Sequence, residues 1–478
     1  MDASSAPNPV VTETAAGSQE DLDVLLSRIN NLSGGGSGDV SGGAAPSADS
    51  QPKANVGQDG AYYPREPSSF QEAGVSRAIV EELVVKFLMA AGEASIRKIS
   101  DQVCLPFVMI ESLITSLKSE QILGYIDQSP VDGYVCKLTE VGRDRGRAYS
   151  QLSSYYGSTP VSFNAYVESV NAQTINDQNP TREDLERAFH DLLIDPDMMI
   201  RLGPAVNSGR GMFLFGYPGN GKTSIAERIT AAFGPYVWIP RAISMDRDIV
   251  RVFDPMSHEE VPLEQGEGIM ASEDFDRRWV RIKRPTIVVG GELTMEHLEI
   301  QYNPATGISE APVQMKSNTG LLLIDDFGRQ RMSVDELLNR WIVPLEKRYD
   351  FLNTSNGKKI QVPFDQLVVF STNLEPKDLV DDAFLRRIPY KIEVANPSIE
   401  NFIKLFQIMC KVYKFEWKPE LIQGLLTKHY LPTNRPLRNC HPRDLLLQVQ
   451  NYCKYLGQPI VLSEEALDFA CENYFSIM

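Results

Sequence analysis

Residues 216–223 have the sequence Gly-Tyr-Pro-Gly-Asn-Gly-Lys-Thr, which matches the pattern G-x-x-x-x-G-K-[S/T] at every fixed position. The apolar residues 211–215 precede it and predict a short buried strand, and residues 224–233 follow it with helical spacing. A strand, a glycine-rich turn and a helix N-terminus together form a cradle whose backbone N–H groups bind phosphate. Gly219 and Gly221 are expected to turn these N–H groups inward, because glycine readily adopts positive φ angles. The stretch therefore predicts a phosphate-binding loop.

The side chains of this loop indicate a nucleoside triphosphate with Mg²⁺ as its ligand. Lys222 is placed to reach the β- and γ-phosphates, and the hydroxyl of Thr223 is placed to bind Mg²⁺. We expect ATP to be bound by Gly216, Pro218, Gly219, Asn220, Gly221, Lys222, Thr223 and Ser224. The alternative, a chance glycine loop before a core helix, does not explain the lysine, the hydroxyl and both flanking elements together.

The bulk composition predicts a chain of several domains without a membrane span. The chain has 478 residues and 42% hydrophobic residues, which allows about two to four domains with sizeable cores. No run of apolar residues is long enough to cross a bilayer, and the N-terminus has no signal-peptide pattern. The six cysteines are scattered without a C-x-x-C pair, which is typical of free thiols in a reducing, cytoplasmic setting. A net charge of −16 disfavours non-specific binding of nucleic acid by the whole chain.

Residues 1–70 are rich in Ser, Gly, Ala, Pro and Asp, and we expect an acidic disordered tail. Residues 21–32 interrupt it, with Leu22, Leu25 and Ile29 on one face of a predicted helix. This helix is either a docking element on a tether or a transient helix without a role.

Residues 71–150 have the pattern of a winged helix, in which three helices are followed by a hairpin and a closing helix. We predict helices over 76–91, 96–103, 106–121 and 139–149, and strands over 124–127 and 134–138. The third helix contains one lysine, two glutamates and no arginine, whereas a helix that contacts bases carries Arg, Lys, Asn or Gln on its exposed face. We therefore favour a protein-binding role for this domain, with DNA binding as the alternative.

The rest of the chain predicts a linker, an α/β domain and a helical appendage. Residues 151–180 have the composition of an ordered linker. Strands and helices alternate over 181–396, which predicts a three-layer domain around a parallel sheet, with a β-rich insertion at 235–316. Residues 397–478 have helical periodicity throughout.

Two carboxylates and an amide follow buried strands in the α/β domain. Residues 321–324 are apolar and end at Asp325 and Asp326, beside the phosphate loop if the sheet is parallel. Asp325 is then placed to bind Mg²⁺ together with Thr223, and Asp326 to orient the attacking water. Asn373 ends the next buried strand, where its amide is placed to contact the γ-phosphate or that water. The alternatives are an ordinary acidic turn and an ordinary turn residue.

Three arginines complete the candidate site. Arg386 and Arg387 end a short predicted helix, from which one is expected to reach the nucleotide of a neighbouring subunit. Arg443 lies in the first turn of a helix in the C-terminal appendage and is placed to contact the β- and γ-phosphates. The structural alternatives are arginines that cap a helix C-terminus and a plain surface arginine.

In this order, these motifs resemble the AAA+ ATPases over residues 181–478. The resemblance implies that 216–223 is Walker A, that Asp325 and Asp326 are Walker B, and that Asn373 is sensor 1. It also implies an arginine finger at Arg386 or Arg387, sensor 2 at Arg443, a helical lid, and a ring, expected to be a hexamer. Residues 203–206 are implied at the adenine pocket. One departure is Asp326, because most of the family has glutamate there; the shorter acid predicts slow hydrolysis or help from another acid such as Glu346.

Hairpins expected near 302–309 and 349–362, and the helix at 338–348, resemble the MoxR and magnesium-chelatase branch. That branch implies a chaperone-type ATPase that remodels or assembles a protein client. A nucleic-acid-binding ATPase and a scaffold with slow turnover are the competing functions. Residues 277–284 hold five bases around Trp279, and for them we favour an alternating strand over a site for an acidic partner.

Overall fold

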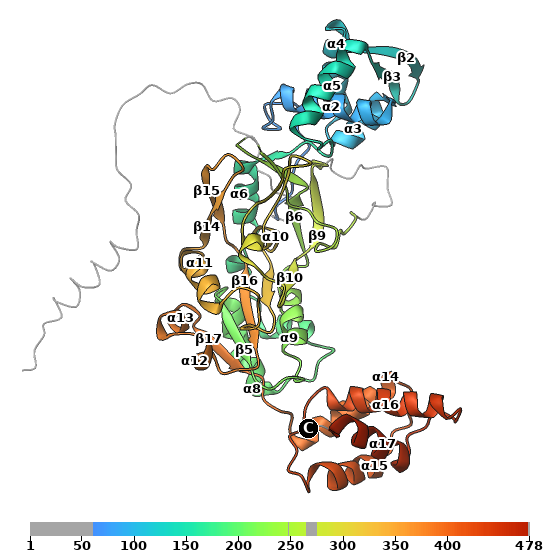
Figure 1. Ribbon diagram of the computed structural model, residues 1–478, viewed down its shortest axis with the longest axis vertical. Coiled ribbons are helices and arrows are strands. Elements are labelled where there is room, and N and C mark those ends of the chain that lie inside the picture. The colour runs from blue at the N-terminus through green and yellow to red at the C-terminus, as the bar shows by residue number, and fades with distance from the viewer. Residues whose placement is uncertain (1–60, 247, 264–274, 477–478) are drawn as a thin grey trace, which may run out of the picture. The chain divides into compact units, whose positions relative to one another are not determined.

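The computed structural model describes residues 61–246, 248–263 and 275–476 (Figure 1). The chain divides into two units, Met1–Ala54 and Asn55–Met478, and every described residue belongs to the second. The helix predicted over residues 21–32 lies outside the described residues. Within the described ranges, no helix combines the length and the apolar character that a membrane span requires.

Residues 61–70, which we expected to belong to the disordered tail, are part of the second unit and pack against its strands β6 (Tyr236–Pro240) and β9 (Trp279–Lys283). The ring of Tyr62 lies 5.7 Å from that of Trp279, and the ring of Tyr63 lies 5.7 Å from that of Trp238, both edge-on. Aromatic pairs of this geometry add to the gain from apolar burial. The acidic composition of the tail hid this pair of tyrosines, and the prediction is wrong for these ten residues.

The first part of the described chain contains four helices and a small antiparallel sheet of order β1-β3-β2. The elements are α2 (Arg77–Ala91), β1 (Glu93–Ser95), α3 (Ile96–Val103), α4 (Phe107–Ser119), β2 (Leu123–Ser129), β3 (Gly133–Leu138) and α5 (Glu140–Leu152). The side chains of Ser76, Ser95 and Thr139 cap α2, α3 and α5 by accepting backbone N–H groups. The predicted elements of this region are therefore present within a few residues of their expected ends.

Five parallel strands form the central sheet, in the order β10-β13-β16-β5-β17 (Figure 1). They are β5 (Met212–Phe215), β10 (Thr286–Val289), β13 (Leu321–Ile324), β16 (Leu367–Thr372) and β17 (Tyr390–Glu393). The chain leaves β5 towards one side of the sheet and later crosses to β17 on its other side. Ligands of open parallel sheets bind beyond the carboxyl ends of the strands at such a switch point. The sheet therefore gathers the residues that follow β5, β13 and β16 at one edge.

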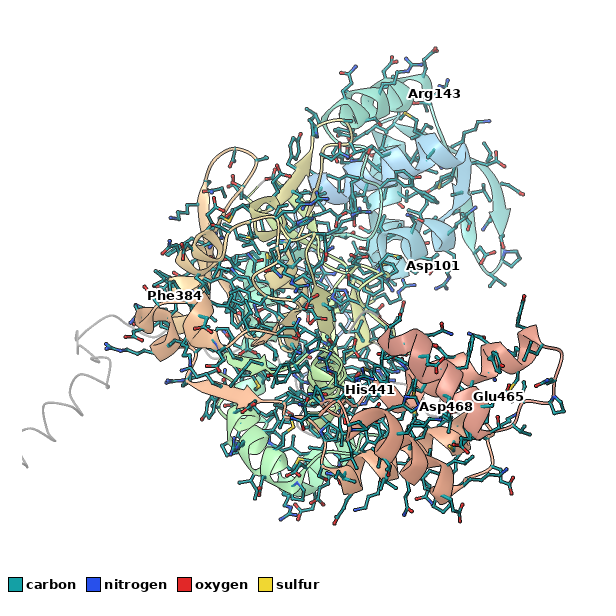
Figure 2. All side chains as sticks on the ribbon, turned by 60° about the horizontal axis from the view of Figure 1, so that its bottom comes forward. Asp101, Arg143, Phe384, His441, Glu465 and Asp468 are labelled. Atoms are coloured by element: carbon teal, nitrogen blue, oxygen red, sulfur yellow. The ribbon has the colours of Figure 1, made fainter. Side chains whose placement is uncertain are left out.

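Helices cover both faces of this sheet, because successive side chains of a strand point to opposite faces. Met212 and Leu214 belong to one apolar core, and Phe213 belongs to the other. The first core includes residues of α7 (Arg182–Ala188), α8 (Pro196–Asn207) and α9 (Lys222–Ile229); the second includes residues of α11 (Val334–Lys347), α12 (Pro376–Leu379) and α13 (Asp382–Arg387). Phe384, which Figure 2 labels, anchors α13 in the second core. The result is a mixed α/β fold of three layers around a parallel sheet.

Two segments that we expected to be an insertion and a linker contribute strands and a helix to the fold. The segment 235–316 supplies β10 to the central sheet, in addition to its own strands. The segment 151–180, expected to be a linker, holds β4 (Val161–Ser162) and α6 (Phe163–Ala172). β4 pairs with β7 in a second, mixed sheet of order β11-β12-β8-β7-β4.

The other strands of that second sheet are β7 (Ala242–Met245), β8 (Asp248–Arg251), β11 (Gln301–Asn303) and β12 (Ile308–Glu310). Two further antiparallel pairs are β6 (Tyr236–Pro240) with β9 (Trp279–Lys283) and β14 (Tyr349–Asn353) with β15 (Lys359–Pro363). The β11–β12 and β14–β15 pairs are the two hairpins predicted from the sequence, and Gly357 has the positive φ that the second turn requires.

Helices α14 (Ile399–Val412), α15 (Pro419–Leu425), α16 (His441–Tyr455) and α17 (Glu464–Phe475) form the C-terminal part with their own apolar core. His441 and Asp468, labelled in Figure 2, lie on α16 and α17. The His441 ring is buried, and its Nδ1 lies 3.0 Å from the hydroxyl of Tyr430. Burial and the neighbouring Arg438 and Arg435 lower the pKa of His441 to about 4, although Asp444 opposes this. The core is therefore built around a neutral imidazole at neutral pH.

Candidate functional site

The loop between β5 and α9 has the backbone of a phosphate cradle. Gly216, Gly219 and Gly221 have φ values of 134°, 86° and 87°, which L side chains rarely adopt. Gly221 is the N-cap of α9, so the helix begins at Lys222 rather than at Ser224 as predicted. The helix ends at Ile229, and a 3₁₀ turn over Thr230–Ala232 continues the predicted span. The unpaired N–H groups of the first helical turn and the helix dipole thus point into this loop.

Lys222 is buried and is held by three oxygens. Its Nζ donates to the carbonyl of Gly216 at 2.9 Å, to that of Tyr217 at 3.1 Å and to Oδ1 of Asn373 at 2.8 Å. Burial lowers the pKa of the ammonium group, and Asp325 and Asp326 partly oppose this. All three acceptors are neutral, so an anionic phosphate is a stronger partner for this ammonium group than the ones it has.

The acidic side of the site lies at the end of β13. The hydroxyl of Thr223 donates to Oδ2 of Asp325 at 2.8 Å, which joins the first turn of α9 to this strand. Asn373 Nδ2 donates to Oδ1 of Asp326 at 3.2 Å. The Asn373 amide therefore bridges Lys222 and Asp326, with its oxygen towards the lysine and its nitrogen towards the aspartate. The structure brings all of these predicted residues together.

Asn220 links the phosphate loop to two other segments. Its side chain is 2% exposed and donates to Oδ1 of Asn396 at 2.8 Å, in the connection between β17 and α14. Its Oδ1 accepts the backbone N–H of Asn439 at 3.3 Å, and its carbonyl accepts the Asn439 amide at 3.1 Å. The backbone N–H of Cys440 donates to the carbonyl of Gly219 at 2.9 Å. The C-terminal helices are thus hydrogen-bonded directly to the loop.

A cavity of about 850 Å³ opens between these elements; we call it the P-loop cavity. Its lining residues are Leu192, Leu193, Ile194, Asp195, Asp197, Met198, Arg201, Pro218, Gly219, Asn220, Gly221, Lys222, Thr223, Ser224, Ile225, Asp325, Asp326, Arg329, Asn373, Glu393, Val394, Ala395, Asn396, Pro397, Ser398, Asn401, Leu405, Met409, Asn439, Cys440 and Arg443. The volume is in the range of pockets that bind nucleotide-sized ligands. Most of the residues predicted to bind ATP and Mg²⁺ line it.

Several predicted residues lie elsewhere. Arg386 and Arg387 do not line the cavity; Arg387 pairs with Glu346, with Nε 3.4 Å from Oε2. Glu346, the candidate helper acid, is likewise outside the lining. Arg386 is exposed and has no hydrogen bond or ion pair within the described part of the chain.

The remaining lining residues of the cavity differ in part from the prediction. Residues 203–206 do not line it, whereas residues 192–195, Met198 and Arg201 do. Arg443 lines the cavity as predicted, and its Nε donates to Asp444 at 2.8 Å. The sequence analysis missed Arg201 and Arg329, because neither lies within a recognisable motif. The Asp-Pro step that begins α8 was the available signal for a helix start next to the cavity.

The basic segment 277–284 is satisfied internally. Arg277 pairs with Asp101, Arg278 with Asp276 and Lys283 with Glu259, and Arg281 donates to the carbonyls of Val261 and Pro262. Arg284 is buried and donates to the carbonyls of Gly234 and Thr319. The interpretation as a structural strand was therefore the better one.

Comparisons with known proteins give a limited picture. A family model described as a domain of unknown function, DUF8689, matches residues 398–473, the C-terminal helices. No curated protein sequence matches the chain. Among solved structures, the Thermotoga maritima RuvB Holliday junction branch migration motor is 12% identical, over 64% of this chain and 72% of that chain, with a TM-score of 0.32. Two point mutants of the same protein align at 11% and 12% identity, over 65% and 60% of this chain and 73% of theirs, with TM-scores of 0.33 and 0.35. Likeness at this level says nothing about function, which rests on the site itself.

Proposed function

We propose that this chain is an AAA+ ATPase that binds and hydrolyses ATP in the P-loop cavity. The observation that carries the proposal is one hydrogen-bonded chain of groups. Thr223 contacts Asp325, while Lys222 contacts Asn373, which contacts Asp326, all at the N-terminus of α9 and the carboxyl edge of a parallel sheet. These are the groups that phosphoryl transfer requires, namely a cation for phosphate, oxygens for Mg²⁺ and an acid near the attacking water.

The residues present fit ATP with Mg²⁺. The first turn of α9 and Lys222 would hold the β- and γ-phosphates, and the apolar side chains of Ile194, Met198 and Leu405 offer a surface for the base. The Thr223 hydroxyl and the Asp325 carboxylate are hard oxygen ligands side by side. Mg²⁺ would neutralise charge on the phosphates, and water and phosphate oxygens would complete its shell. No described group of three or more His, Cys, Asp or Glu forms a cage of its own, which suits an ion that arrives with its nucleotide.

Asp326 would orient the water that attacks the γ-phosphorus. Its backbone has a φ of 48°, in the left-handed region, and its N–H donates to Oδ1 of Asp325 at 3.0 Å. Strained backbone of this kind persists where the surroundings impose it, and Asp tolerates it better than most residues. Asn373 holds the carboxylate from the other side. The shorter acid would give slow turnover, and a slowly hydrolysing scaffold is the rival function on the same site.

An arginine from a neighbouring subunit would complete the site. Arg386 fits this role better than Arg387, because Arg387 is paired with Glu346 and Arg386 has no partner within the described ranges. A trans-acting arginine implies a ring, and we propose a hexamer. Arg443 would contact the phosphates from the C-terminal helices, which would act as a lid.

The first part of the chain would select the client. We propose a winged helix used for protein binding, on a chaperone-type ATPase similar to the MoxR and magnesium-chelatase branch. The exposed face of α4 carries Val108, Glu111, Thr115 and Lys118, which offers a phosphate backbone a single cation beside an acid. Lys118, the one lysine of α4, lies over the Tyr125 ring at 3.8 Å. DNA binding is the second function; the full chain is expected to show no anisotropy change with duplex DNA at low salt, and salt-dependent binding would favour the rival.

The test of ATP hydrolysis is turnover by the purified full chain and two variants. Lys222→Ala is expected to lower kcat/KM by about 10³-fold, or about 4 kcal/mol, because the phosphates lose their buried cation. Asp325→Asn should raise the Mg²⁺ concentration needed for activity. Lys137→Ala, an exposed lysine on β3, is the control. Full ATP affinity and turnover in Lys222→Ala would contradict the proposal.

A further inference from the structure

The turn after β13 is held rigidly from both sides. Phe327 is 2% exposed, and its ring packs against Phe213 and Phe370 at centroid distances of 6.0 and 5.0 Å. Gln330 closes the turn, since its Nε2 donates to the carbonyl of Asp325 at 2.9 Å and its Oε1 accepts the N–H of Gly328 at 2.8 Å. The backbone of the turn is therefore held in one conformation, including at position 329, between Gly328 and Gln330.

That residue is Arg329, which lines the P-loop cavity. Its backbone N–H donates to the carbonyl of Asp326 at 3.0 Å, so the turn brings it back beside the acid of the site. Its side chain is exposed and has no hydrogen bond or ion pair among the described residues. By contrast, Lys222 is held by three oxygens and Arg443 by Asp444. Arg329 is thus a free guanidinium group at the acidic end of the cavity.

The acidic end of the cavity needs a further cation when a nucleotide is bound. Asp325 and Asp326 face one lysine, and a bound γ-phosphate brings further negative charge close to both carboxylates. During hydrolysis charge shifts within the phosphates, and a positioned guanidinium stabilises it in a site that excludes water. A planar, permanently charged fork of donors suits phosphate oxygens better than an ammonium group does.

We propose that Arg329 is a catalytic residue that acts in the same subunit and donates hydrogen bonds to the γ-phosphate of ATP as it is transferred to water. The inference rests on the proposed ATPase function. The water oxygen forms a bond to the γ-phosphorus, the bond from that phosphorus to the β–γ bridging oxygen breaks, and its electron pair stays on ADP. The products are ADP, phosphate and the proton released from the water. Arg329 remains protonated throughout and only donates hydrogen bonds.

The experiment compares the full chain with Arg329→Ala, Arg329→Lys and Arg331→Ala. Arg331 is two residues further along the same turn, is exposed and does not line the cavity, so it is the matched control. We expect Arg329→Ala to lower kcat about 10²-fold, the cost of removing one preorganised donor. The lysine variant should recover part of the rate, because it restores the charge without the fork.

Binding measurements separate a catalytic role from a structural one. The Kd for ATP should change by less than about threefold in Arg329→Ala, while affinity for ADP with aluminium fluoride should fall with kcat. The inference would be overturned if Arg329→Ala had the same kcat as Arg331→Ala. It would also be overturned if Arg329→Ala lost equal affinity for ATP and for ADP with aluminium fluoride. The wild type and Lys222→Ala distinguish the two failures. If only the Arg329 inference is wrong, the wild type hydrolyses ATP and Lys222→Ala does not. If the ATPase function itself is wrong, the wild type shows no turnover, or Lys222→Ala turns over ATP as fast as the wild type.

Discussion

Strand β9 and the P-loop cavity both concentrate cations, and they use them in opposite ways. In the strand and its flanks, Arg278 and Arg284 are buried, and their donors are taken up by Asp276 and by backbone carbonyls. In the cavity, Arg201 and Arg329 are exposed and have no ion pair in the part of the chain that the structure describes. A buried charge must be paired to be tolerated, whereas a charge that binds a ligand must keep donors free. The density of bases in a sequence therefore says less about binding than whether their donors are already used.

The largest effect should come from removing one partner of the buried ion pair beside strand β9. Arg278→Ala leaves Asp276 buried without its partner, which should destabilise the fold by about 3–5 kcal/mol. The measurement is the thermal unfolding midpoint of the full chain. Arg147→Ala removes an exposed pair with Asp144 and should leave the midpoint nearly unchanged. Equal midpoints for the two variants would show that burial of the pair makes no difference.

The P-loop cavity is tested by removing the charge of Asp326 without changing the size of its side chain. Asp326→Asn keeps the shape and loses the charge, so we expect kcat to fall by about 10²- to 10³-fold while ATP still binds. Asp378→Asn, an exposed acid on α12, is the control. Unchanged kcat would exclude Asp326 from the reaction. A rise in kcat in Asp326→Glu would show that the shorter acid limits the rate of turnover.

The buried, neutral His441 is expected to make the stability of the fold depend on pH. The folded pKa of His441, about 4, lies below its unfolded value, so the unfolded chain binds more protons between the two. Stability is therefore fully present above about pH 6.5 and is lost as the pH falls towards 4, by about 2 kcal/mol between pH 7.5 and 5.0. Hydrogen exchange of the α16 and α17 peptides at several pH values should show this loss of stability. His441→Phe should make the stability of these helices depend less on pH. The same change of stability with pH in His441→Phe as in a His190→Phe control would contradict a role for the buried imidazole.

The smallest effect should come from the link between the phosphate loop and the C-terminal helices. Asn439→Ala removes one hydrogen bond to Asn220, worth about 1 kcal/mol, or about fivefold in ATP affinity if ATP binding requires the C-terminal helices to stay against the loop. Titration calorimetry with ATP would measure it. Asn451→Ala, exposed on α16, should bind like the wild type. Equal affinities for both variants would show that the hydrogen bond between Asn439 and Asn220 does not contribute to ATP binding.

The sequence predicted the elements whose signal is local. The strands before Asp325 and Asn373 were legible because four or more apolar residues end at a polar one, and both hairpins were found from their turns. β10 was missed because it is four residues long and lies within a polar segment, and its parallel pairing with β13 is non-local. The partners of Arg284 were invisible because they are carbonyls of distant residues, Gly234 and Thr319, and the same holds for the Ala73 carbonyl that Arg278 contacts besides Asp276. Arg329 was missed because the left-handed backbone of Asp326, not a motif, brings it to the cavity.

The central claim is that ATP binds between the phosphate loop and the C-terminal helices. Hydrogen–deuterium exchange of the full chain with and without Mg·ATP tests it most directly, because each side of the cavity gives its own peptides. Protection is predicted both in peptides that cover 216–224 and in peptides that cover 438–443, and Lys222→Ala should lose it in both. No protection at 216–224, or equal protection in Lys222→Ala, would contradict the account.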